Sequence, residues 1–126
     1  MSSLPRKWLL SSAAVLVAIL AIVTTAWIHE ERAYGARRAV TEEGLKRLAA
    51  QISEFRRSYG RFPTNLLQLA TEFKTELPRD GWGGAITYEI ESTNHFRLTA
   101  MSPYPHLDTF EYDCDNSRMK ITIVPF

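Results

Sequence analysis

The hydrophobic and polar positions divide the chain into an apolar N-terminal segment, a helical segment and a strand-rich remainder. No charged residue interrupts the 21 positions 8–28. At about 1.5 Å rise per residue, a helix of this length spans about 31 Å, close to the thickness of the hydrocarbon core of a bilayer. Trp8 and Trp27 bracket the segment, and tryptophan prefers the headgroup level of a membrane. The pattern therefore predicts a transmembrane helix over residues 8–28, preceded by a short tail at 1–7.

Small residues recur along one side of this predicted helix. Their spacings of three and four place them on one face: Ser11, Ala14, Ala18, Ala21 and Thr25. Helices in lipid associate by close packing, and small residues let two backbones approach. The face is therefore a candidate docking surface for another transmembrane helix. The alternative is that alanine and serine are simply common in such helices.

The N-terminus also has the basic residues of a signal peptide, Arg6 and Lys7. The apolar run is longer than the usual h-region of about 7–15 residues, which favours a retained anchor over a cleaved signal. Five Lys/Arg residues follow the run within about 20 positions, and as a bare count they oppose export of the domain. Long domains translocate largely regardless of charge. We therefore expect a bacterial inner-membrane protein with a cytoplasmic N-terminus and a periplasmic C-terminal domain.

A second helical pattern follows the apolar segment. No proline occurs between His29 and Tyr59, and apolar residues recur at helical spacing: Leu45, Leu48, Ile52, Phe55 and Tyr59. This predicts an extramembrane helix over 29–60, ending at Gly60, with a stripe that covers a sheet. A short helix over 65–74, capped by Thr64, is expected next.

The remainder alternates between apolar and polar residues in short runs. Strands are predicted at 86–91, 96–100, 110–114 and 119–124, with Thr93-Asn94 at a hairpin tip. The expected fold class is α+β: a long N-terminal helix, then a domain at 61–126 with a short second helix and a small antiparallel sheet of about four strands.

Charge and chemistry restrict the function classes. Beyond Arg6 and Lys7 the chain carries 13 Lys/Arg against 14 Asp/Glu, so a nucleic-acid partner is not expected. Cys114 is the only cysteine, which excludes an internal disulfide. His29, His95 and His106 lie far from one another and from Cys114 in the sequence, and neither a metal-ligand spacing nor a phosphate loop occurs. We expect no enzyme activity, no cofactor and no small-molecule substrate.

Two sequence motifs occur in order after the long predicted helix. Tyr59-Gly60-Arg61-Phe62-Pro63 is followed by Leu77-Pro78-Arg79-Asp80-Gly81-Trp82-Gly83 and then by Tyr88 in a predicted strand. The combination resembles the major pseudopilin of type II secretion, the protein G family. That family has Tyr/Asn-Gly-x-Tyr/Phe-Pro before Leu-Pro-x-Asp-Pro-Trp-Gly and a strand with tyrosine. The resemblance covers about residues 8–100 and implies a pseudopilin-like fold.

The chain departs from that family in three respects. Pro5-Arg6-Lys7-Trp8 stands where a prepilin cleavage motif is expected, and the apolar run lacks the glutamate of pseudopilins. Gly81 replaces the proline of the loop. The family's calcium loop is rich in aspartate and glycine, whereas here the glycines are missing and only the carboxylates remain: Asp108, Asp113 and Asp115. These three are weak calcium candidates, since strand-end and turn aspartates need no metal.

The sequence favours a non-enzymatic accessory subunit that docks onto other transmembrane subunits of a larger complex, for example a respiratory or photosynthetic one. The alternatives are a divergent component of a type II secretion system and a cleaved, soluble periplasmic binding protein. The candidate interface residues in loops are Trp82 and Tyr104. Trp82 is interpreted first as a plug of the core. Tyr104 is the better interface candidate, because Pro103 and Pro105 restrict its loop and reduce the entropy lost on binding.

Overall fold

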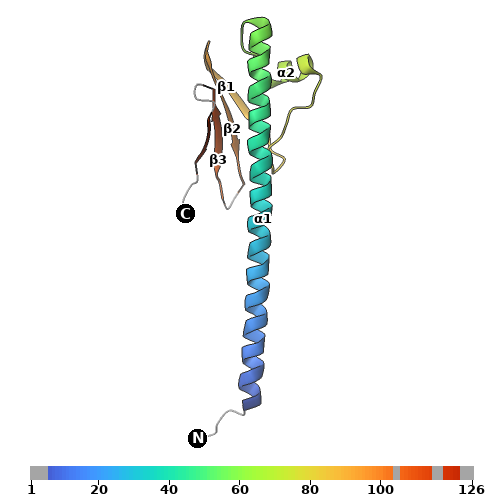
Figure 1. Ribbon diagram of the computed structural model, residues 1–126, viewed down its shortest axis with the longest axis vertical. Coiled ribbons are helices and arrows are strands. Elements are labelled where there is room, and N and C mark those ends of the chain that lie inside the picture. The colour runs from blue at the N-terminus through green and yellow to red at the C-terminus, as the bar shows by residue number, and fades with distance from the viewer. Residues whose placement is uncertain (1–5, 104–105, 115–117, 123–126) are drawn as a thin grey trace. The chain divides into compact units, whose positions relative to one another are not determined.

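A computed structural model describes residues 6–103, 106–114 and 118–122 of the chain. Over these residues the fold is α+β, with a long apolar N-terminal helix, a short second helix and an antiparallel sheet (Figure 1). The fold class expected from the sequence is therefore confirmed. The chain divides into two compact units, Met1–Gly35 and Ala36–Phe126. The described part of the first unit is entirely helical, and the second unit holds the sheet.

The first helix, α1, runs from Arg6 to Tyr59 without an internal proline. Arg56 and Arg57 lie in its last turn, where positive charge complements the helix dipole. Gly60 ends the helix, as predicted: it has a left-handed φ of +71°, and its N–H donates to the Arg56 carbonyl at 2.7 Å. Glycine adopts this conformation without the steric cost that a Cβ brings.

The second helix, α2, runs from Leu66 to Phe73. Its cap is Asn65, whose side-chain oxygen accepts the Gln68 N–H at 2.8 Å. The prediction of Thr64 as the cap was wrong by one residue, because asparagine caps a helix at least as well as threonine. The Thr64 N–H instead donates to the side-chain oxygen of Gln68 at 2.8 Å. At the other end Lys74 is left-handed, with φ +50°, and its N–H bonds the Ala70 carbonyl.

The sheet is built from strands that pair antiparallel in sequence order. Its elements are β1 (Thr87–Ser92), β2 (His95–Met101), β3 (Thr109–Asp113) and β4 (Arg118–Thr122). Each strand bound lies within one or two residues of its prediction, and residues 123–124 of the last predicted strand fall outside the described residues. The Thr93-Asn94 turn joins β1 to β2, as expected. Leu98 lies opposite Tyr88 on one side and Tyr112 on the other.

One face of the sheet and one stripe of α1 form the core of the second unit, and the sheet and α2 flank α1 in Figure 1. Leu45, Leu48, Ile52 and Phe55 are all buried, as the helical spacing predicted. The other members come from the loops, α2 and the strands: Ala49, Phe62, Leu69, Ile86, Phe96, Leu98, Ala100 and Phe110.

Two apolar residues whose spacing places them on the same face as buried neighbours are exposed instead. Tyr59 ends α1 half-exposed and donates its hydroxyl proton to the Glu72 carboxylate of α2. Ile90 is 46% exposed, since it lies on edge strand β1 beside the hairpin turn. Both corrections concern the ends of elements, where the pattern continues but the covering layer does not.

Candidate functional site

The described residues of the first unit present a continuous apolar surface. From Leu10 to Ile28 its large apolar side chains are between 49% and 70% exposed. Among the described residues, α1 is the helix that is long and apolar enough to cross a membrane. Trp27 is 65% exposed within this segment, and the side chain of Trp8 lies outside the described part. An apolar band of this extent is typical of a surface that contacts something other than water.

The small-residue face lies within this helix. Its members Ser11, Ala14, Ala18, Ala21 and Thr25 are all exposed. The Thr25 hydroxyl donates to the Ala21 carbonyl at 2.7 Å, and the Thr24 hydroxyl donates to the Leu20 carbonyl at 2.8 Å. These bonds satisfy the hydroxyl donors inside the helix, which an apolar environment requires. An open hollow of about 440 Å³ runs beside Ala21, Thr25 and His29.

The loop that carries Trp82 is organised by the buried carboxylate of Asp80. One of its oxygens accepts the N–H groups of Trp82 and Gly84, both at 2.8 Å. A Cβ on Gly84 would lie 2.5 Å from the other oxygen, so the loop closes tightly on the carboxylate. The Asp80 N–H completes the loop by donating to the Gly84 carbonyl at 3.0 Å.

The Trp82 ring is half-buried and packs against the core. Its centroid lies 6.0 Å from that of Phe110, at an interplanar angle of 40°. This places Trp82 at the edge of the core, with part of the ring available at the surface.

Tyr104 and Pro105 lie outside the described residues, but the two ends of their loop are visible. The Ser102 hydroxyl accepts the Asp108 N–H at 2.8 Å, and the Ser102 N–H donates to the Asp108 carbonyl at 2.9 Å. Ser102 and Asp108 are both buried. Residues 102 and 108 therefore close the loop that carries Tyr104.

The three calcium candidates are not gathered at one place. Asp108 precedes β3 and Asp113 ends it, and five residues of strand separate their Cα atoms by roughly 16 Å. One cation cannot contact both carboxylates. Asp115 lies outside the described residues. The predicted strand at 110–114 already placed extended backbone between the two, and the structure confirms that this strand keeps them apart.

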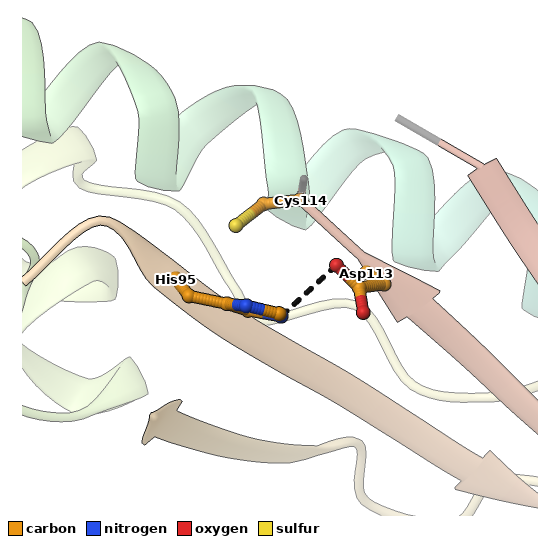
Figure 2. Close-up of side chains that lie close together, drawn as sticks. All are labelled: His95, Asp113 and Cys114. Atoms are coloured by element: carbon orange, nitrogen blue, oxygen red, sulfur yellow. Dashed lines mark ion pairs between the residues drawn. The ribbon is translucent and has the colours of Figure 1, made fainter. Parts of the chain in front are cut away.

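Asp113 instead meets His95 at the end of the sheet (Figure 2). The Nε2 atom of His95 lies 2.9 Å from an Asp113 oxygen and 3.2 Å from a Glu91 oxygen. Arg97 lies beside them, 2.6 Å from Glu91 and 3.1 Å from Glu111. The result is a network of three carboxylates, one imidazole and one guanidinium across β1, β2 and β3.

Cys114 completes this end of the sheet. Its sulfur accepts the Phe96 N–H at 3.2 Å and lies 3.6 Å from the Asn94 carbonyl, to which the thiol can donate. Ligand atoms of His95, Asp113 and Cys114 all lie within 4.8 Å of one another. The distance along the sequence suggested that Cys114 lies far from all three histidines. For His95 this expectation was wrong, because the β2–β3 pairing brings residue 95 beside residues 113 and 114.

A histidine, an aspartate and a cysteine could in principle act as a nucleophile with its base, or as metal ligands. Nucleophilic catalysis requires the thiol to face the imidazole. Here a hydrogen bond directs the thiol proton to the Asn94 carbonyl, while the imidazole pairs with carboxylates. The arrangement fits metal ligation better, because one nitrogen, one oxygen and one sulfur donor lie within 4.8 Å of one another.

No protein-family model, curated protein or solved structure matches the chain. The resemblance to the major pseudopilins therefore depends on the sequence motifs alone.

Proposed function

We propose that this protein is a non-enzymatic, single-pass subunit of a bacterial inner-membrane complex, with its C-terminal domain in the periplasm. The apolar surface of α1 between Leu10 and Ile28 carries the proposal. Burying one large apolar side chain contributes roughly 2 kcal/mol to the free energy of folding. Leaving even five such side chains of this segment in water therefore forfeits on the order of 10 kcal/mol. That is comparable with the whole net stability of a domain, about 5–15 kcal/mol. Lipid removes this cost.

The small-residue face supports docking onto another transmembrane helix. Ala14, Ala18 and Ala21 have short side chains, so this side of the helix carries no bulky group. The Thr25 hydroxyl donates its hydrogen bond within the helix. Neither feature obstructs the close approach of a second backbone. The domain would then be held at the periplasmic surface of the partner subunits.

The fold of the second unit supports a pseudopilin-like origin. The order of long helix, short helix and antiparallel sheet agrees with the resemblance, and the Asp80 loop holds Trp82 against the core. A divergent component of a secretion system is therefore the second candidate. The absence of a glutamate from residues 8–28 favours a fixed subunit over a fibre-forming one.

Membrane integration is tested by alkaline extraction of membranes that contain the full chain. We expect the protein to stay in the pellet. The double variant Ile19→Lys/Ile22→Lys should move into the soluble fraction, because each lysine at the centre of a span costs about 3 kcal/mol. Leu67→Lys is the matched control, since Leu67 is 71% exposed on α2, and it should stay in the pellet. Extraction of the unmodified protein would contradict the anchor.

The three candidate functions are separated by a mild-detergent purification with mass spectrometry of partners and of the N-terminus. An unprocessed chain inside a large complex supports the accessory subunit. An N-methylated, shortened chain with secretion proteins supports the divergent pseudopilin. A chain cut after the apolar segment supports the soluble binding protein and contradicts the proposal.

A further inference from the structure

We infer that His95, Asp113 and Cys114 form a binding site for a divalent transition-metal ion, with zinc as the favoured ion. The three side chains offer one nitrogen, one oxygen and one sulfur donor, all within 4.8 Å of one another (Figure 2). Zinc binds all three donor types. The inference does not depend on membrane insertion, since the site lies wholly in the second unit.

The geometry needs only small adjustments to hold the ion. Tetrahedral zinc with bonds of about 2.0–2.3 Å places its ligand atoms roughly 3.3–3.8 Å apart. The His95 Nε2 to Asp113 oxygen distance of 2.9 Å must open by roughly 0.5 Å, and contacts near 4.8 Å must close by about 1 Å. Rotation of side chains that are only partly buried can supply changes of this size.

The strands fix the three ligands at one end of the sheet. Arg97 is the register partner of Asp113, so the β2–β3 pairing sets residue 95 near the end of β3. The Phe96 N–H bond orients the sulfur of Cys114. Such contacts around a metal site position its ligands before the ion arrives.

The charges around His95 also favour a cation. Glu91 and Asp113 both approach the Nε2 atom of His95, with carboxylate oxygens at 3.2 and 2.9 Å. Arg97 neutralises part of this charge from Glu91 and Glu111, and Lys120 lies across from Glu111 in β4. A divalent ion bound between His95, Asp113 and Cys114 would add positive charge beside the carboxylates of Asp113 and Glu91.

The donor set selects the class of ion. Thiolate and imidazole ligands favour zinc and related transition metals, whereas calcium and magnesium prefer oxygen donors alone. The thiol of Cys114 releases its proton to solvent when the metal–sulfur bond forms. The fourth position is open to water or to Glu91, whose Oε2 lies 3.2 Å from the His95 Nε2 while its Oε1 lies 2.6 Å from Arg97.

Cobalt(II) is the first probe, added to the full chain in detergent micelles. We expect binding at one ion per chain, with visible bands of tetrahedral cobalt and a near-ultraviolet band from sulfur-to-cobalt charge transfer. Excess zinc should remove both. Cys114→Ser should lose the near-ultraviolet band. His95→Gln and Asp113→Asn should each weaken binding by at least about tenfold. His106→Gln is the matched control and should leave the affinity unchanged within about twofold.

A second measurement uses the unmodified protein and needs no variant to fold. Cys114 is the only cysteine, so the rate at which a thiol reagent modifies the chain reports on this residue alone. Zinc should slow the modification by about tenfold or more, because the bound sulfur is no longer a free nucleophile. An unchanged rate at saturating zinc, or cobalt spectra without a sulfur band, would overturn the inference and leave His95 and Asp113 as an ion pair.

Discussion

The Gly81 amide donates a hydrogen bond to the Thr41 hydroxyl at 2.8 Å, and this bond joins the Trp82 loop to α1. Thr41 is fully buried, and its hydroxyl in turn donates to the Arg37 carbonyl at 2.9 Å. The loop lies directly on the helix backbone, since a Cβ on Gly81 would be 2.0 Å from the Arg37 oxygen. Where the resembling family has proline, this chain needs both the N–H and the missing side chain of glycine.

Gly81→Ala should therefore destabilise the second unit. The added methyl group must push the loop away from α1, which costs about 1–3 kcal/mol as overpacking. The measurement is the free energy of unfolding of the full chain in detergent, from denaturant titration. Gly81→Pro should lose at least as much, because it also removes the donor to Thr41.

Gly35→Ala is the control for this pair of substitutions. Apart from the local helix backbone and the neighbouring residues, no atom lies within 4 Å of the position that its Cβ would occupy, so alanine should be neutral or stabilise the helix by up to about 1 kcal/mol. An equal loss in Gly35→Ala and Gly81→Ala would mean that close packing at Gly81 is not the cause.

Tyr88 makes the stability depend on alkaline pH. Burial raises the pKa of Tyr88 to about 12, and the charge of Cys114 adds to the effect. Because the pKa in the folded state lies above the ordinary value of 10.0, its contribution to stability is complete below pH 10 and is lost as the pH rises towards about 12. Unfolding free energies measured across this window should fall with pH.

Tyr88→Phe separates this effect from other titrations. The Tyr88 hydroxyl donates to the Pro63 carbonyl at 2.9 Å, so the variant should lose about 1 kcal/mol at neutral pH. Its stability should decline less steeply between pH 10 and 12 than that of the unmodified chain. The same slope in both proteins would show that Tyr88 does not carry the dependence.

Lys74→Gly should stabilise the C-terminal end of α2. Lys74 has a left-handed backbone with φ +50°, in which a side chain costs free energy and glycine does not. We expect a gain of about 0.5–1 kcal/mol in the free energy of unfolding. Thr71→Gly is the contrasting variant, because Thr71 lies inside the helix, and there glycine should destabilise the protein. A loss in both variants would contradict the assigned cap.

Ala18→Ile tests the small-residue face of α1. The larger side chain should hold a partner helix away and reduce recovery of the other subunits in a mild-detergent purification. Leu20→Ile is the control, because it changes the shape of a side chain outside the small-residue face without adding volume. Equal recovery of the partners with both variants would argue against docking through this face.

Local patterns predicted the elements of the fold where one physical rule dominates. The spacing of Leu45, Leu48, Ile52 and Phe55 identified the buried side of α1 because burial follows the helical period. Gly60 marked the end of α1 because it takes a left-handed conformation without strain. The cap of α2 was misplaced by one residue because Thr64 and Asn65 offer similar capping oxygens.

The candidate metal site could not be predicted from the sequence. Its ligands are residue 95 and the adjacent residues 113 and 114, and no short-range sequence spacing relates the first to the other two. The register of β2 and β3 brings them together, and register is set by the packing of whole strands on the core. Asp108 and Asp113 are a different case, because the extended backbone of one strand, β3, is enough to keep their carboxylates apart.

The sequence by itself determined the apolar length of residues 8–28, the helical stripe, the alternation of the strands and the α+β class, because each depends on neighbours along the chain. The tertiary structure alone decided which polar side chains meet. It placed His95 beside Asp113 and Cys114, and it seated Gly81 on the backbone of α1 beside Thr41. Those contacts depend on how strands and loops pack over distances of tens of residues, which local periodicity does not specify.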